Sequence, residues 1–492
     1  MIKSDEKTSL SNSFQLKNDE IVQVGIQNIN SPKNIDINEA LENAGFGCGT
    51  ILYIAGSFLA CAFDGSLMIV LPLVGPALKC EWNLTSFDLS CLNMSTYIAH
   101  ALSAALSAPL GDRFGRRPIA LVGAVGMTIF GVLCGFVNAY WQLLLFRVLI
   151  GVFFGIGNAP TMILSGEIPP KKYRALAFSG MMLAYGVGVV ITSGIAYLMF
   201  GVLKWGWKSL MLGSSLVFSP CVLLLFIIRE SPRYHYYNGD LKNAEETIRI
   251  IYKLNGKGNV RLKLEKRDDM HVIEDKSNSF SFREVIRILH DSDNQRNTLC
   301  LMVIAIASYF NYFFYGYSMP RILYEGYCSG INASSVVETC TYDKSVLFDV
   351  VTINTSEPLG LIITLVLLET FGRKRIFMVL GVTGIVLAIP LYFCVHHYYL
   401  TTFLFLLYPV IASMSLTPSL LISEYTPTVI RSTMGSIQTA VAGVGTILAM
   451  SSVEFALEAG PRCVIAIIQG LVIVYSISIC MLKRETMGVD LL

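Results

Sequence analysis

Charged residues are scarce in this sequence: they make up 15% of its 492 residues, whereas a typical soluble domain carries about 25%. Their distribution is uneven, because residues 1–47 and 229–296 hold about half of them. The remaining chain is too apolar to be soluble in water, and the mean hydropathy of the whole chain is +0.58. These properties exclude a soluble enzyme, a secreted scaffold and a nucleic-acid-binding protein. The net charge of +2 says nothing about partners.

Several chemical motifs are also missing. No spacing of cysteine and histidine residues indicates a zinc site, and no nucleotide-binding signature occurs. We therefore expect no metal and no cofactor, and any work that the protein does must draw on ion or substrate gradients. Residues 1–47 are polar and lack the basic start and apolar core of a signal peptide. We expect this tail to be disordered, apart from a short helix at 38–43.

Apolar runs long enough to cross a membrane are abundant, since about 20 residues suffice for one helix. Twelve runs have this length, at about 48–76, 88–110, 119–138, 141–164, 175–199, 207–228, 297–318, 345–368, 376–395, 399–421, 433–455 and 461–482. They predict an all-α membrane protein with 12 transmembrane helices. The predicted domains are a tail at 1–47, a six-helix bundle at 48–228, a linker with short helices at 229–296, a second bundle at 297–482, and a tail at 483–492.

Lys and Arg residues predict the orientation of the chain in the membrane. They gather in the links after spans 2, 4, 8 and 10, in the insert at 229–296 and after span 12, whereas the opposite loops contain few. Short loops rich in Lys and Arg stay on the cytosolic side. We therefore expect both termini and the insert to be cytosolic.

The two halves of the chain repeat each other at a constant offset. Residues 112–117 (Asp-Arg-Phe-Gly-Arg-Arg) return as residues 369–374 (Glu-Thr-Phe-Gly-Arg-Lys), and a second motif with Glu, Pro and Arg at 167, 170 and 174 returns at 424, 427 and 431. Two motifs that share one offset indicate two bundles related by an axis along the membrane normal. Transporters that rock around a central site have this architecture.

The repeated charges form a candidate cytosolic gate that would latch the halves together in the outward-facing state. Breaking partly desolvated pairs of this kind costs on the order of a few kcal/mol. The simpler alternative is that the arginines only enforce topology. The gate residues are Asp112, Arg113, Arg116, Glu167, Arg174, Glu369, Arg373, Glu424 and Arg431.

Four motifs resemble signatures of the major facilitator superfamily. Residues 111–117 are similar to its loop signature after span 2, and Arg147 with Gly151, Gly155 and Gly157 is similar to its fourth-span signature. Residues 230–233 (Glu-Ser-Pro-Arg) and 485–488 (Glu-Thr-Met-Gly) resemble its elements after spans 6 and 12. The resemblance implies the major facilitator fold, with two pseudo-symmetric six-helix bundles.

Within the superfamily, the chain most resembles the group of synaptic vesicle glycoprotein 2 and its related protein, which is close to the organic-ion transporters. Residues 40–46 resemble the segment before span 1 of that group, and residues 80–82 resemble its first lumenal loop. Sugar porters would carry a Gln-Gln pair in span 7, where this chain has Asn311 and Tyr312.

Ionisable residues inside the spans are candidates for a substrate or proton cavity, because burying each costs about 2.5–3.5 kcal/mol on insertion scales. They are Asp64 in span 1, Arg147 in span 4, and Asp349 and Glu357 in span 8. In the aromatic span 7, Asn311 and Tyr315 share one helix face and complete the candidate set. The charge of the substrate stays open, because the carboxylates suit a cation or a coupled proton and Arg147 suits an anion.

The leading hypothesis is a transporter that moves a small organic ion by alternating access, with a coupled proton allowed. The alternatives are a sugar porter, or a membrane protein with a transporter fold that acts mainly by binding partners. We expect a lipid-embedded monomer in the plasma membrane or an intracellular vesicle membrane.

The loop at 319–344 is the longest predicted lumenal loop. It contains the glycosylation acceptor Asn332 and two cysteines, Cys328 and Cys340. The lumen is oxidising, so these cysteines can pair there. Cys80 in the neighbouring loop is a competing partner, and the pairing stays open.

Overall fold

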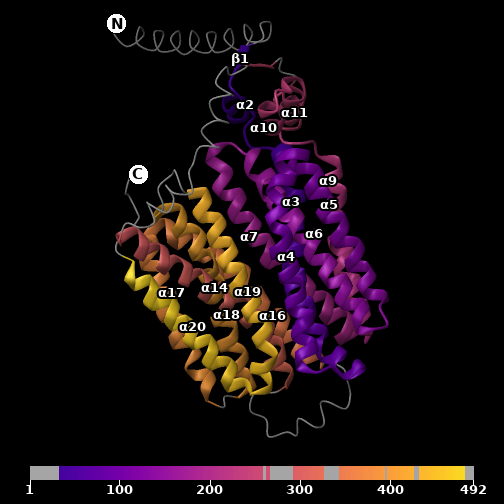
Figure 1. The fold of residues 1–492 in the computed structure, drawn as a ribbon, viewed down its shortest axis with the longest axis vertical. Coiled ribbons are helices and arrows are strands. Elements are labelled where there is room, and N and C mark those ends of the chain that lie inside the picture. The colour runs from indigo at the N-terminus through magenta and orange to yellow at the C-terminus, as the bar shows by residue number, and fades with distance from the viewer. Residues whose placement is uncertain are drawn as a thin grey trace, which may run out of the picture.

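The computed structural model describes residues 33–258, 262–265, 292–325, 343–393, 396–425 and 431–482. Two helical bundles stand side by side, and a small polar subdomain sits on one end of the N-terminal bundle (Figure 1). We call this subdomain the cap; it comprises β1 (Lys33–Ile35), α2 (Ile37–Ala44), α10 (Pro232–Tyr237), α11 (Leu241–Leu254) and β2 (Leu262–Leu264). The end of the bundles that carries the cap is the cap side, and the opposite end is the far side.

The N-terminal bundle contains six helical passes. They are α3 (Cys48–Trp82), α4 (Ser86–Phe114), α5 (Arg116–Leu133) with the short η1 (Cys134–Phe136), α6 (Tyr140–Glu167), α7 (Lys171–Ala196) with η2 (Tyr197–Val202), and α8 (Trp207–Phe218) with α9 (Pro220–Ile227). Within the bundle α4 packs on α6, α5 packs on α6, and α3 packs on α7.

The C-terminal bundle contains the corresponding six passes. They are α14 (Ser292–Glu325), α16 (Lys344–Phe371), α17 (Arg373–Ala388) with η3 (Pro390–Tyr392), α18 (His397–Tyr425), α19 (Arg431–Glu458) and α20 (Pro461–Met481). Its main internal pairs are α14 with α19, α14 with α20, and α16 with α18.

Eleven helices among the described residues are long and apolar enough to cross a membrane. The remaining pass of membrane length is α4, whose 29 residues include several Ser and Thr. In this helix polar side chains face the bundle interior, where Ser103 and Ser107 donate to backbone carbonyls of α6. The prediction of 12 transmembrane helices is therefore confirmed, and α4 is the pass with the weakest hydropathy signal.

Two glycines mark the repeat in the backbone. Gly115 ends α4 with φ of 103°, and Gly372 ends α16 with φ of 88°, a region that L side chains rarely adopt. The two positions differ by the offset that relates the halves in the sequence. The tight reversal between the second and third helix of each bundle therefore has the same cause in both.

Several predicted boundaries are wrong because helices continue past the apolar runs. Cys80 lies inside α3, which extends to Trp82, and not in a loop. Arg321 lies inside α14, which extends to Glu325, whereas the apolar run ends at 318. These extra turns bring charged side chains into the interface between the bundles.

The bundles touch along three helix pairs: α3 with α14, α4 with α19, and α7 with α16. Figure 1 shows the two halves converging at the far side and diverging toward the cap. Side-chain contacts across the interface lie between the middle of the helices and their far-side ends. They include Tyr185 with Tyr312, Tyr97 with Phe313, Ser193 with Asn354, Tyr197 with Phe348, and Ser86 with Glu458. The far side is therefore closed in this conformation.

The cap is attached to the first transmembrane helix through Asn255, the residue after α11. Its side-chain oxygen accepts from the backbone N–H of Gly49 at 2.8 Å, and its amide nitrogen donates to the Ala44 and Gly45 carbonyls. Tyr252 donates its hydroxyl to the Ala40 carbonyl at 3.0 Å, and burial raises the pKa of Tyr252 to about 12. The hydroxyl therefore stays a donor at physiological pH.

The docking of the cap is testable through Asn255→Ala. The substitution leaves the Gly49 amide without its partner, so we expect the cap to detach more easily, by about 1–3 kcal/mol of local opening free energy. Hydrogen exchange of α2 and α11 measures this, and both should exchange faster. Lys253→Ala, at an exposed position on α11, is the matched control and should change nothing. Unchanged exchange in Asn255→Ala would contradict the attachment.

Candidate functional site

Glu357 on α16 occupies the middle of the bundle interface. It is 2% exposed, and its Oε1 accepts from the Tyr312 hydroxyl on α14 at 2.5 Å. Its Oε2 is buried without a partner among the described residues. The N-terminal bundle closes the site from the other side, because a Cβ built on Gly186 of α7 would lie 3.3 Å from the Glu357 carboxyl carbon. A buried carboxylate this poorly paired is costly, so the site is built for more than packing.

Three tyrosines surround this carboxyl group, and together with Glu357 we call them the central site. Tyr312 and Tyr408, on α18, stack with ring centroids 6.4 Å apart, and Tyr185, on α7, lies 6.3 Å from Tyr312. The Tyr408 hydroxyl faces the same carboxyl group without hydrogen-bond geometry, and it is buried with no partner among the described residues. Sequence reasoning did not select any of the three tyrosines, because neutral aromatic residues in apolar helices carry no distinguishing signal.

The span 7 candidates, four residues apart on one face of α14, have different surroundings. Asn311, beside Tyr312, is 2% exposed, and its Oδ1 has no partner within the described chain. Tyr315 instead points into the C-terminal bundle, where its hydroxyl donates to the Leu404 carbonyl at 2.7 Å. Its ring stacks on Tyr408 at 5.2 Å, so Tyr315 orients a residue of the central site and does not line it.

Asp349 lies away from the central site, contrary to the sequence prediction. It sits near the far-side end of α16, where its Oδ2 is 2.7 Å from Nε2 of His397, a half-exposed residue at the start of α18. Two helical turns separate Asp349 from Glu357, which places it at the rim of the bundle. Its role there is to join two helix ends.

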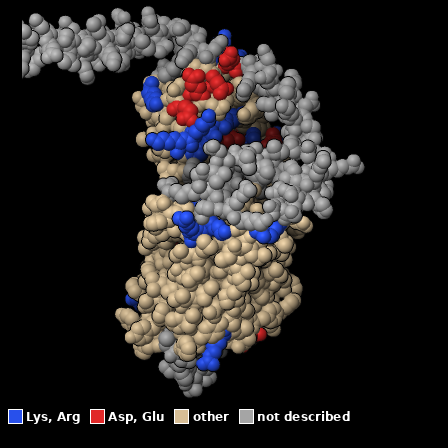
Figure 2. Space-filling view, turned by 90° about the vertical axis from the view of Figure 1, so that its left-hand side faces the viewer, with Lys and Arg blue, Asp and Glu red and all other residues tan. Residues whose placement is uncertain are grey.

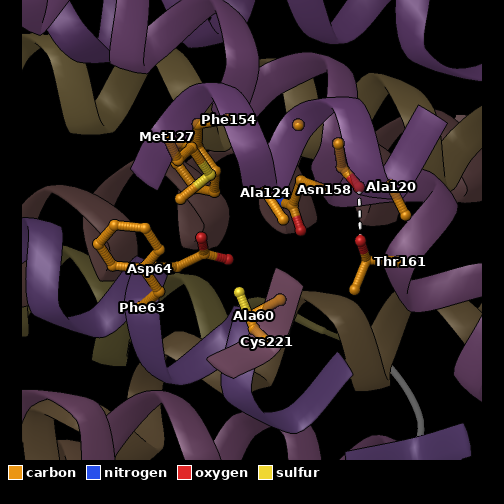
Figure 3. Close-up of a pocket in the computed structure, with 12 residues that line it drawn as sticks. Ala60, Phe63, Asp64, Ala120, Ala124, Met127, Phe154, Asn158, Thr161 and Cys221 are labelled. Carbon is orange, nitrogen blue, oxygen red and sulfur yellow. Dashed lines mark hydrogen bonds between the residues drawn. The ribbon is translucent and has the colours of Figure 1, made fainter. Parts of the chain in front are cut away.

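Asp64 faces a cavity inside the N-terminal bundle. Figure 3 shows its carboxylate directed into this cavity, with Asn158 and Cys221 on other walls. The lining comes from α3, α5, α6 and α9, and the volume of about 20 Å³ is enough for a water molecule but not for an organic solute. Glu357 does not line this cavity.

Arg147 is 2% exposed on α6, and its Nε has no partner among the described residues. The backbone carbonyl of Arg147 accepts from Thr96 of α4 at 3.2 Å, which fixes the position of α6 beside the helix that contacts the second bundle. In the described part of the chain no carboxylate forms an ion pair with the Arg147 side chain.

A buried ion pair closes the far side. Arg321 of α14 lies 3.8 Å from Glu454 of α19, and the side chains are 5% and 1% exposed. The Tyr317 hydroxyl donates to Glu454 at 2.5 Å. A Cβ built on Gly75 of α3 would lie 3.2 Å from Arg321 Nη1, so the N-terminal bundle packs closely against the pair. The sequence prediction does not include Glu454, although it is an ionisable residue in a predicted span, and it places Arg321 in a loop.

The predicted gate residues of the first half cluster on the cap side. Arg116 lies 3.2 Å from Asp112 and 3.8 Å from Glu167, and its guanidinium stacks over Tyr234 of α10. Tyr234 also donates to the Arg113 carbonyl at 3.3 Å. Arg174 donates to the neighbouring Pro169 carbonyl at 3.4 Å. These contacts tie the cap to its own bundle and do not cross to the second one.

In the second half, the structure describes the side chain of one predicted gate residue, Arg373. Arg373 begins α17 and is half-buried. The side chains of Glu369, Glu424 and Arg431 lie outside what the structure describes. The latch between the halves therefore stays a prediction.

The candidates for modification also lie mostly outside the described residues. Asn332, Cys328 and Cys340 fall in the loop that is left out, so the glycosylation site stays a prediction. Cys80 is disulfide-bonded, whereas the other described cysteines are free. Its partner stays a prediction too.

The surface agrees with a membrane-embedded protein. In Figure 2, Lys, Arg, Asp and Glu side chains gather at the cap, and a broad uncharged belt covers the bundles below it. Two pseudo-symmetric six-helix bundles that enclose a buried polar site at their interface define a multi-pass membrane transporter of the major facilitator type.

Comparison with known proteins identifies the family. The chain matches the family described as "Sugar (and other) transporter" over residues 81–492 and belongs to it. The synaptic vesicle 2-related protein of Xenopus laevis is 26% identical over 92% of this chain and 81% of its own. The gallate transporter of Pseudomonas putida is 26% identical over 41% of this chain and 44% of its own. The partially occluded inward-open xylose transporter XylE from E. coli shares the fold, with a TM-score of 0.66 at 16% identity, covering 90% of this chain and 99% of that one.

The family settles the broad function. The protein is an integral membrane transporter of a small molecule, and it is not an enzyme. The predicted resemblance to the major facilitator superfamily and to the synaptic vesicle 2-related group is confirmed.

The far-side closure is testable with Glu454→Gln. The substitution removes the charge that Arg321 faces, and breaking a buried pair costs about 3–5 kcal/mol. We expect the far side to open. Ser90→Cys reports this, because Ser90 lies on the same face of α4 as Ser86 and Asn93, which contact the second bundle. An impermeant maleimide should label it from the far side about tenfold faster.

Glu458→Gln is the matched control for that experiment. Glu458 lies on the same helix, where it faces Lys79 at 3.9 Å and accepts from Ser86 across the interface, but its side chain is 56% exposed. Its contacts therefore contribute about 0–1 kcal/mol. It should change labelling little. Equal labelling of the two variants would show that the Arg321–Glu454 pair does not hold the far side closed.

Proposed function

We propose that the protein moves a small organic ion across its membrane by alternating access. In this proposal the bundles at 48–228 and 297–482 rock about the central site, and the cap side faces the cytosol. The buried, incompletely paired Glu357 at the bundle interface is the observation that carries the proposal. A group at that position is exposed to one side and then to the other as the bundles rock.

Asp64 has a separate role in this proposal. Its cavity has room for a water molecule but not for an organic solute, so Asp64 suits a proton that is carried in exchange for or together with the substrate. A carboxyl group in such a place gains or loses its proton as the local water content changes. The membrane is the plasma membrane or a vesicle membrane, with both termini cytosolic.

The rival function is that of a membrane protein that retains the fold and acts by binding partners. Its strongest support is the cap, which presents acidic and basic clusters (Figure 2). The contacts of the cap, however, are satisfied by its own bundle, through Asn255 and Tyr234. These two contacts dock the cap on its own bundle.

Flux through reconstituted protein tests the proposal. Full-length protein in liposomes is screened with labelled organic cations, organic anions and sugars, with and without a pH gradient. We expect flux of at least one organic ion, and about a tenfold or larger loss in Asp64→Asn at unchanged protein content. Folded protein that moves no member of the panel would favour the partner-binding function, and full flux in Asp64→Asn would make Asp64 a structural residue.

The cap-side gate is tested with the same Ser90→Cys reporter. If Asp112 and Arg174 stabilise the outward-facing state, Asp112→Asn and Arg174→Ala shift the ensemble toward the conformation described above, which is closed on the far side. Far-side labelling should then fall about threefold, equivalent to less than 1 kcal/mol. Lys172→Ala, an exposed neighbour in the same segment, serves as control. Unchanged labelling in both gate variants would leave the arginines with a topological role only.

A further inference from the structure

We infer that the central site selects an organic cation, an ammonium compound that carries an apolar or aromatic group. The inference rests on the proposed transport function and adds the charge of its substrate. It starts from the polar atoms that the protein leaves unsatisfied where the two bundles meet.

The unsatisfied atoms favour a hydrogen-bond donor with positive charge. Two acceptors, Glu357 Oε2 and Asn311 Oδ1, are buried without partners among the described residues, and so is the Tyr408 hydroxyl, which can donate or accept. A carboxylate and an amide oxygen can only accept. An ammonium group supplies several N–H donors and also neutralises the buried carboxylate, whereas a sugar hydroxyl supplies the donor without the charge.

The tyrosine rings favour the same ligand. Tyr185, Tyr312 and Tyr408 come from three different helices, and their rings lie around one carboxyl group. Aromatic faces attract cations, with about 0.5–2 kcal/mol per well-placed ring. Tyr315 stacks on Tyr408 and is itself anchored to the Leu404 carbonyl, so at least one of these rings is held in place before a ligand arrives.

An anion would need a different place. The only intramembrane candidate for an anion among the predicted cavity residues is Arg147, whose carbonyl contacts Thr96 in the far-side half of α4. At the central site the Glu357 carboxylate and the electron-rich tyrosine rings repel a carboxylate, and one unpartnered hydroxyl, that of Tyr408, can donate to it. A gallate-like organic acid would therefore have to bind at Arg147, away from Glu357.

The position of the site explains how a bound cation would be moved. Tyr185 and Gly186 belong to the N-terminal bundle, whereas Glu357, Tyr312 and Tyr408 belong to the C-terminal bundle. Rocking of the bundles therefore changes which side of the membrane Glu357 faces. The ion pair between the bound cation and Glu357 moves with the C-terminal bundle. The ring of Tyr185 belongs to the other bundle, so the motion takes it away from the cation or brings it back.

Three solutes of similar size and different charge test the inference: phenethylammonium, 2-phenylethanol and phenylacetate. Binding to purified full-length protein is measured by calorimetry, and uptake of each labelled solute is measured in liposomes. We expect phenethylammonium to bind at least about tenfold more tightly than the other two. Glu357→Gln should weaken its binding about tenfold or more, and Tyr185→Leu should weaken it more than Tyr185→Phe, which keeps the ring.

Asp349→Asn is the matched control, because it removes a carboxylate from the same helix outside the site, and it should bind phenethylammonium like the unaltered protein. If Glu357→Gln misfolds, Tyr408→Phe removes only a hydroxyl and should still weaken binding severalfold. Two results would overturn the inference: tighter binding of phenylacetate, or phenethylammonium binding that is unchanged in both Glu357→Gln and Tyr408→Phe. Either result would leave the proposed transport function intact. Binding of phenethylammonium at Glu357 without flux of any solute would instead uphold the cation site and contradict the transport function.

Discussion

Two carboxylates, Glu357 and Glu454, are buried where the bundles meet, and the protein satisfies them in different ways. Glu454 forms an ion pair with the Arg321 guanidinium, 3.8 Å away, and accepts a hydrogen bond from the Tyr317 hydroxyl. Glu357 has one hydroxyl, from Tyr312, and an oxygen left over. Because a buried charge is stable only when it is paired, the first carboxylate holds a closed interface together. In the proposed function, the substrate supplies the partner of the second.

The difference between the two carboxylates requires each bundle to be rigid. A flexible bundle would rearrange and give Glu357 a partner from the protein itself. Close backbone contacts supply the stiffness. A Cβ on Gly65 of α3 would meet the Tyr185 carbonyl of α7, and one on Gly188 of α7 would meet the Ala62 carbonyl of α3. In the second bundle, Gly445 of α19 lies against the backbone of Ile306 on α14. Helices packed so closely move together, and Asp64 and Tyr185 lie beside these contacts.

Much of the fold was predictable from the sequence, because the apolar runs and the repeat are strong signals. Glycines at 115 and 372 carry the repeat into the backbone itself. Helix ends were less predictable, since Arg321 and Cys80 continue their helices beyond the apolar runs. Polar side chains can extend a helix where a neighbouring bundle covers them, and that cover is invisible in hydropathy.

The candidate site was predictable in type but not in arrangement. Glu357 stood out as a charge in a span, but Asp64 and Asp349 did so equally, and they occupy an internal cavity and the rim. Span 7 is aromatic on all sides, so nothing in its pattern shows that Tyr312 faces the carboxylate while Tyr315, three residues later, faces its own bundle. Side-chain direction in such a helix is decided by tertiary packing.

Movement of the bundles about the central site is tested most directly by distances between spin labels at Phe114→Cys and Phe371→Cys. These exposed residues end the repeat-related helices α4 and α16 on the cap side. In proteoliposomes, a saturating cation that binds at Glu357 should redistribute the population between a longer distance, as in the conformation described here, and a shorter one. A single distance, the same with and without the cation and in Glu454→Gln, would contradict the account.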